Sequence, residues 1–98
     1  MASIFFAREV ALDFQRILTH LREYASVDGT ARLTGLKAAI GVLESNPLIG
    51  RPCGDGCREL IIGRGTRSYI ALYEYDERMD LVSILAIRSQ RESGYHHP

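Results

Sequence analysis

The sequence predicts an α+β domain in which a helical hairpin packs on one face of a four-stranded, mainly antiparallel sheet. Apolar residues recur at helical spacing over residues 8–25 and again over residues 30–45. Residues 58–87 instead contain three short apolar stretches separated by turns, and strands joined by about five residues are usually antiparallel neighbours. The predicted order of elements is therefore β-α-α-β-β-β, within a single domain that spans residues 1–98.

Composition places the chain among globular proteins with one modest core. Of its 98 residues, 46% are hydrophobic, which argues against a disordered chain. No apolar run approaches the roughly 18–20 residues that a membrane span needs. The first residues lack the basic stretch and long apolar segment of a secretory signal. We therefore expect a cytoplasmic protein that has no membrane partner.

The N-terminal half predicts one strand and two helices. Residues 3–6 are short and apolar and predict the first strand, and residues 8–25 predict a helix with one apolar stripe toward the core. The polar residues of this helix lie off the stripe and should face water, whereas Leu12 lies off it and is available to a partner. The second predicted helix, residues 30–45, ends at an Asn-Pro pair because the residue before proline disfavours helical geometry.

The C-terminal half predicts a loop and then a three-stranded meander. Residues 47–57 contain two prolines and three glycines and predict the loop. Residues 58–62, 69–75 and 81–87 predict the strands, and the last of these is apolar on both faces, which is typical of the interior of a sheet. Residues 92–98 are polar and are expected to form a flexible tail.

Charge is balanced overall but uneven in kind. The formal net charge is +0, and eleven of the twelve basic residues are arginine, whose planar guanidinium suits carboxylates and phosphates. A cluster of arginines with a tyrosine can hold phosphates, stabilise developing negative charge without a metal, or bind an acidic peptide. The alternative is a mixed surface where each arginine is paired locally. The candidates in the meander and tail are Arg58, Arg64, Arg67, Arg88, Arg91 and Tyr95.

Other chemistry finds little support in the sequence. Cys53 and Cys57 have C-x3-C spacing, but the only further good zinc ligands are His96 and His97 in the tail, so we expect two free thiols and no metal. No nucleophile is paired with a base and an orienting acid, and no glycine-rich phosphate loop follows a strand. No cofactor is expected.

Four stretches, taken in order, carry a resemblance that covers almost the whole chain. They are Ala7–Ile17, an opening helix with small residues, an Asp, a large apolar residue and an Ile; Asn46–Pro52, a Pro-x-x-Gly-Arg loop; Arg58–Leu60, the start of a strand; and Tyr69–Tyr73 with Ile84–Tyr95, two closing strands and a basic tail. Together they resemble the RelE/ParE superfamily of bacterial toxins, the toxic halves of type II toxin–antitoxin (plasmid-stabilisation) modules.

The resemblance implies a fold, a partner and two possible targets. Members of this superfamily have a curved sheet with a helical hairpin on one face and the other face open. A cognate antitoxin, whose C-terminal segment wraps the toxin, is implied as the partner. RelE-like members cleave mRNA in the ribosomal A site with basic residues and often a C-terminal tyrosine. ParE-like members lack that set of residues and poison DNA gyrase.

Individual residues match the superfamily only in part. Arg88 matches its arginine after the last strand, Arg58 matches the arginine that opens its second strand, and Tyr95 falls where ribonuclease members place a tyrosine. Many members have arginine directly after the tyrosine of the third strand, where this chain has Ile70. Arg67, in the preceding turn, is the candidate to fill that gap. An isoleucine on the open face would suit a protein partner better than a nuclease site.

These observations predict a ParE-like toxin that acts on DNA gyrase by binding it. The alternatives are a metal-independent, ribosome-dependent ribonuclease and a degenerate module that binds antitoxin without being toxic. The predicted target-binding residues are Arg58, Arg64, Arg67, Ile70, Arg88 and Arg91. The ribonuclease alternative would use Arg58, Arg67, Arg88 and Tyr95. The predicted antitoxin contacts are Leu12, Ile70 and Leu72.

Overall fold

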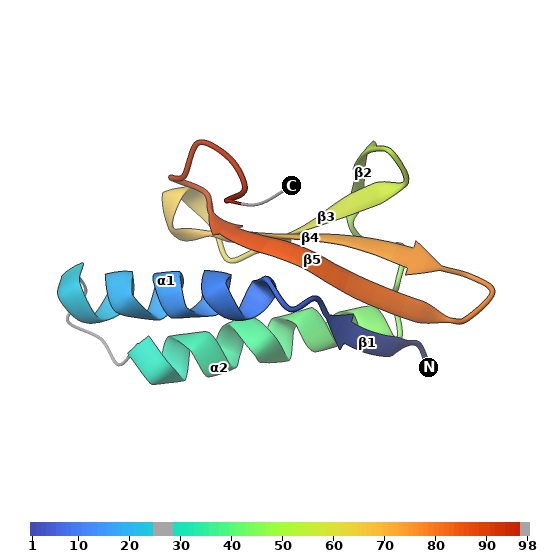
Figure 1. The fold of residues 1–98 in the computed structure, drawn as a ribbon, viewed down its shortest axis with the longest axis horizontal. Helices are drawn as coiled ribbons and strands as arrows, with labels where there is room; N and C mark the ends of the chain where they lie inside the picture. The colour runs from blue at the N-terminus through green and yellow to red at the C-terminus, as the bar shows by residue number, and fades with distance from the viewer. Residues whose placement is uncertain (25–28, 97–98) are drawn as a thin grey trace.

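The computed structural model describes residues 1–24 and 29–96 and has two layers, with both helices on one side of a sheet (Figure 1). The predicted α+β class, a helical hairpin on one face of a mainly antiparallel sheet, is confirmed. The elements are β1 (Ser3–Phe6), α1 (Val10–Tyr24), α2 (Gly29–Ile40), the 3-10 helix η1 (Gly41–Glu44), β2 (Arg51–Gly54), β3 (Cys57–Ile62), the 3-10 helix η2 (Gly65–Arg67), β4 (Tyr69–Asp76) and β5 (Leu81–Ser89).

The sheet has five strands in the order β1-β5-β4-β3-β2, one strand more than the sequence predicts. The additional strand, β2, comes from the region expected to be a loop. Asp55 and Gly56 both take positive φ, of 54° and 76°, and fold β2 back onto β3 as a hairpin. The Asp-Gly pair is typical of a hairpin turn, but the prolines and glycines around this pair also favour an irregular loop, which is what the sequence predicted. β5 lies inside the sheet, as predicted, between β4 and the parallel strand β1.

The helices differ from the prediction mainly at their ends. α1 begins at Val10, and its expected last residue, Ala25, lies outside the described residues. α2 ends at Ile40 and continues as η1, where the prediction had one helix to Ser45. Gly41 opens η1, and glycine weakens an α-helix relative to alanine, which favours a tighter final turn here.

The core fills the space between the helices and the sheet. Tyr73, on β4, is fully buried there, and its hydroxyl donates to the Pro47 carbonyl and accepts from the Gly50 N–H, both at 2.8 Å. These two bonds hold the loop before β2 against the core. Tyr73 belongs to a cluster of buried apolar residues from the helices and the sheet: Val10, Ile17, Leu21, Leu36, Ile40, Leu43, Ala71, Val82, Ile84 and Ile87.

Two polar side chains of α1 form hydrogen bonds with the part of the β5 edge that β1 does not pair with. β1 ends opposite Ile84, so β5 has no strand neighbour on that side beyond this point. Asp13 accepts from the Ile87 N–H at 2.9 Å, and Arg16 donates to the Ile87 carbonyl at 3.0 Å and to Asp13 at 2.6 Å. The expectation that Arg16 faces water is therefore wrong. Buried backbone groups need such partners, which explains a carboxylate that is 0% exposed inside the apolar stripe of α1.

Candidate functional site

The candidate site is the sheet face that points away from the helices, called here the helix-free face. Strand register places Leu72 of β4 between Glu59 of β3 and Ala86 of β5. In the next row, Ile70 of β4 lies between Ile61 and Arg88. Because paired residues share a face, this surface has an apolar centre with an acidic group on one side and a basic group on the other.

The chain's own C-terminal segment covers this centre. Residues 90–96, called here the strap, curl over the helix-free face (Figure 1). The Tyr95 hydroxyl donates to Glu59 on β3 at 2.6 Å, and its ring lies 5.2 Å from the guanidinium carbon of Arg88 on β5. Glu59 and Arg88 lie on either side of β4, so Tyr95 crosses β4. Of the residues expected to form a flexible tail, 92–96 lie on the sheet in this structure, and His97 and Pro98 lie outside the described residues.

The strap covers one of the predicted contact residues. Ile70 does point to the helix-free face, but it is 0% exposed, and its neighbour Ala86 is 1% exposed. Residues on an uncovered sheet face would remain accessible, so the strap accounts for their burial. Ile70 is therefore not available to an antitoxin or a target in this conformation. Leu72, in the adjacent row, is half-buried, and Leu12 on α1 is 63% exposed, as predicted for a residue off the apolar stripe.

Glu92 anchors the strap to the helix layer. Its carboxylate accepts from Arg16 Nε at 2.9 Å, from Arg16 Nη2 at 3.1 Å and from the Ser89 N–H at 3.1 Å. Its carbonyl accepts from Arg88 at 2.9 Å. Arg16 thus joins the strap to Asp13 and β5. Burial lowers the pKa of its guanidinium, but the Glu92 and Asp13 carboxylates outweigh burial, and the pKa is raised. The arginine-to-carboxylate contact is bidentate, the geometry that gives such pairs their strength.

The electrostatics of the strap contact favour a charged Glu59 and a neutral Tyr95. The hydrogen bond from Tyr95, together with nearby Arg51, lowers the pKa of the Glu59 carboxyl. Burial, and then the Glu59 carboxylate, raises the pKa of Tyr95 well above its ordinary value. A phenol held in this way keeps its proton at neutral pH and can donate a hydrogen bond, but it is a poor base.

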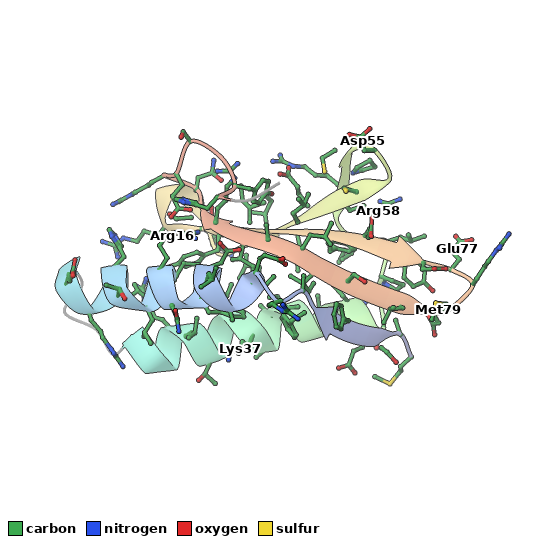
Figure 2. All side chains as sticks on the ribbon, viewed as in Figure 1. Arg16, Lys37, Asp55, Arg58, Glu77 and Met79 are labelled. Carbon is green, nitrogen blue, oxygen red and sulfur yellow. The ribbon has the colours of Figure 1, made fainter. Side chains whose placement is uncertain are left out.

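Arg58 does not join the cluster that the sequence predicts. It is paired with Tyr73, whose side chain lies in the core, so Arg58 points to the opposite face from Arg88. Its guanidinium donates to the Leu48 and Gly50 carbonyls at 3.1 and 2.8 Å and so supports the loop before β2. Figure 2 shows Arg58 well away from Arg16 along the sheet. The only member of the predicted cluster that contacts Arg88 in the described chain is Tyr95.

The remaining predicted arginines are exposed. Arg64 and Arg67 lie around η2, and Arg91 lies on the strap. Within residues 1–24 and 29–96, their side chains have no hydrogen bond or ion pair with another residue. They form a solvated basic edge near the strap, which remains available to an acidic partner.

The far end of the helix-free face is acidic. A shallow hollow of about 650 Å³ lies there, and Glu74, Asp76, Glu77, Arg78 and Leu81 are among the residues that line it. With three carboxylates and one guanidinium, this hollow is negatively charged and would repel a phosphate backbone. The face is thus basic near the strap and acidic at the β4–β5 turn.

The two cysteines and the possible metal ligands were the other candidate groups for chemistry in the sequence. Cys53 and Cys57 are free thiols, and burial raises the pKa of each, which keeps them protonated and weakly nucleophilic. Among the residues that the structure describes, no three His, Cys, Asp or Glu side chains are grouped to hold a metal ion. Within the same residues, none of the helices has the length and apolar character needed to cross a membrane.

The amino-acid sequence of the chain matches one known protein family. The model that describes the ParE toxin of the type II toxin–antitoxin system parDE matches residues 4–94. The chain belongs to the ParE toxin family. The match includes both helices, strands β2 to β5, all of β1 except its first residue, and residues 90–94 of the strap. No curated protein has a sequence similar enough to this ParE-family chain to match it.

Solved structures share the fold of this ParE-family chain at low sequence identity. A chain of the chromosomal ParDE system from P. aeruginosa is 22% identical with a TM-score of 0.76, and the match covers 91% of this chain and 96% of that one. A chain of the intact E. coli RelBE complex is 14% identical with a TM-score of 0.64 and the same coverage. A chain of the M. tuberculosis RelBE2 complex is 22% identical with a TM-score of 0.62, covering 90% and 96%.

Sequence reasoning missed the residues that build this site. Asp13, Arg16 and Glu92 link α1, β5 and the strap, and Glu59 receives the strap. One signal was available: Asp13 lies between Val10 and Ile17 at helical spacing, so it falls within the buried stripe. The contact between Glu59 and the strap had no such signal, because the two are 36 residues apart.

Proposed function

We propose that this ParE-family chain is a cytoplasmic toxin that inhibits growth by binding a protein target, DNA gyrase, and is neutralised by a cognate antitoxin. The family match and the ParDE and RelBE complexes among its structural relatives support the toxin–antitoxin part. The choice of target rests on the helix-free face. A protein target needs a surface of complementary shape and charge, whereas RNA cleavage needs converging catalytic groups.

The separation of two predicted arginines is the main support for a protein target over RNA, and two further observations agree with it. Arg58 and Arg88, the two arginines with matches in the superfamily, lie on opposite faces of the sheet, and Arg58 is engaged by loop carbonyls. Tyr95 donates to a carboxylate that keeps it neutral. The acidic hollow on the same face would also repel RNA. These residues offer no base to remove a proton and no arginine cluster to hold a phosphate.

The proposal is tested by inducing the chain without its antitoxin and following DNA, RNA and protein synthesis separately. We expect early arrest of DNA synthesis with an SOS response. A supercoiling assay with purified gyrase then tests direct inhibition. Rapid loss of translation with cut mRNA would refute the gyrase proposal. Induction without any growth defect would instead support the degenerate module that only binds antitoxin.

The ribonuclease alternative keeps one observation in its favour. Arg88 and Tyr95 are adjacent, which is the one contact within the predicted catalytic set that the described residues contain. If the chain cleaves RNA, Arg88→Ala should abolish cleavage, whereas Arg78→Ala, at the exposed far end of the sheet, should leave it intact. Cleavage retained in Arg88→Ala would remove Arg88 from that role.

A further inference from the structure

The β2–β3 hairpin holds both cysteines of the chain near its tip. Cys53 lies on β2, and Cys57 is the first residue of β3. The strand pairing passes from Pro52 and Arg58 directly to Gly54 and Cys57. Cys53 is therefore the extra residue of a β-bulge. Two residues oppose one in a bulge, so Cys53 lies beside Cys57 across the hairpin.

This placement suits a disulfide bond. Opposed residues of antiparallel strands have Cα atoms about 4.5–5.5 Å apart, and a disulfide joins Cα atoms about 4.4–6.8 Å apart. Electrostatics also indicate that the two thiols are close, because burial and then the neighbouring Cys53 raise the pKa of Cys57. Since a bulge residue has no partner in the strand ladder, a small backbone adjustment at Cys53 breaks no ladder hydrogen bond.

The tip of the hairpin is open to small molecules. Cys53 is exposed and Cys57 is half-buried. A Cβ added at Gly54 or Gly56 would have nothing within 4 Å, so other parts of the described chain do not pack against these positions. Figure 1 shows the hairpin at the edge of the sheet, away from both helices. Exposed disulfides of this kind are the ones that are formed and reduced readily.

We propose that Cys53 and Cys57 are a dithiol site that an excess of a small-molecule disulfide converts to a reversible disulfide bond across the hairpin. The Cys53 thiolate attacks one sulfur of the small disulfide, which forms a mixed disulfide and releases one thiolate. The Cys57 thiolate then attacks the Cys53 sulfur, which forms the new bond and releases the second thiolate. The two cysteines lose two electrons and two protons in all, and the small disulfide is reduced to two thiols. The inference is independent of the target of the toxin.

Exposure and local charge determine the course of this exchange. Cys53 reacts first because it is the more exposed thiol. Burial, and then the Glu59 carboxylate, raises the pKa of Cys53 despite the nearby Arg51, so the thiol is mostly protonated at neutral pH and the first step is slow. The second step is fast, because Cys57 is held next to the mixed disulfide at a high effective concentration. The mixed disulfide therefore does not accumulate.

The test measures the effective concentration of the two thiols in the full-length chain, at equilibrium with oxidised and reduced glutathione. Two cysteines this close in sequence also join in an unfolded chain, so the folded chain in buffer is compared with the same chain in urea. We expect an effective concentration at least about 10-fold higher in the folded chain, which corresponds to about 1.4 kcal/mol. Oxidation should lower the intact mass by about 2 Da, without a glutathione adduct.

Cys57→Ser is the matched control, because it keeps the exposed thiol and removes its partner. Glutathione should remain attached to Cys53 in this variant. Cys53→Ser should also stop at the adduct, and should react more slowly because its remaining thiol is half-buried.

Three results would overturn the proposal: equal effective concentrations in the folded and unfolded chains, a stable glutathione adduct on the unchanged chain, or a disulfide-linked dimer on a sizing column. If a serine variant does not fold, the comparison of the folded and unfolded unchanged chain decides. The assay measures neither growth nor gyrase activity, so its failure is distinct from failure of the gyrase proposal.

Discussion

Replacing Asp13 with alanine tests whether α1 and β5 are held together by a buried carboxylate. Asp13 is fully buried and accepts hydrogen bonds from the Ile87 N–H at 2.9 Å and from Arg16 at 2.6 Å. Asp13→Ala leaves a strand amide without its acceptor and a guanidinium without one of its two carboxylates. Glu92 remains bound to Arg16, so the loss falls on β5 and α1 more than on the strap.

The expected loss is large for a domain of this size. Hydrogen bonds to charged groups contribute about 1.5–3 kcal/mol each, so losing two lowers the free energy of unfolding by roughly 3–6 kcal/mol. Removing one partner of a buried ion pair costs a similar amount. Since domains of this length have a total of about 5–15 kcal/mol, Tm should fall by at least about 12 °C. Asp13→Asn keeps one oxygen acceptor and should lose roughly half as much.

Urea unfolding followed by circular dichroism measures these changes. Glu23→Ala is the control, because Glu23 is an exposed carboxylate on the same helix, and it should change the free energy of unfolding by less than about 0.5 kcal/mol. An Asp13→Ala protein within about 1 kcal/mol of the unchanged chain would show that the carboxylate does not hold β5 to α1, and the reasoning would fail.

Three further predictions concern packing, a loop and pH. Gly50→Ala should destabilise the fold by about 1–3 kcal/mol in urea unfolding, because its Cβ would lie 2.6 Å from the Tyr73 ring. Gly35→Ala, whose Cβ would have nothing within 4 Å, should stabilise the fold by up to about 1 kcal/mol. A Gly50→Ala protein that is more stable than Gly35→Ala would contradict this packing. Arg58→Ala should lower stability by about 1–3 kcal/mol without exposing the surface beneath the strap; an unchanged melting curve would argue against its structural role. The strap should loosen as pH falls below about 4.3, the ordinary pKa of a glutamate. Folding lowers the pKa of Glu59, so the stability that its carboxylate contributes is present above that ordinary pKa and is lost as the carboxyl is protonated. A Tyr95 NMR signal that stays constant from pH 6 to 3 would exclude this.

Local patterns were sufficient for most elements of the fold. Apolar residues at helical spacing determine the buried sides of α1 and α2, and the run from Leu81 to Ile87 determines that β5 lies inside the sheet. These signals are local because a residue's secondary structure depends largely on its neighbours within one or two turns. β2 was missed because the turn residues Asp55 and Gly56 lie among other glycines and a proline, which also favour irregular loops.

The candidate site was only partly predictable. Arg88 and Tyr95 were expected together and are in contact, and Leu12 was expected to be exposed and is. Arg58 was expected in the same cluster and lies on the other face, because neighbouring positions on a strand alternate sides and its register with Tyr73 turns it toward the helices. Ile70 was expected to be open, and the strap covers it.

By itself, the sequence determined that this protein is one α+β domain with a helical hairpin, a meander and a surface of arginines, since periodicity, turn residues and charge are local properties of the chain. Only the tertiary structure decided that Glu92 and Tyr95 return to α1 and β3 and close the helix-free face. The physical reason is that each of these contacts joins groups far apart in the sequence, so each depends on where the strands and the strap meet in space.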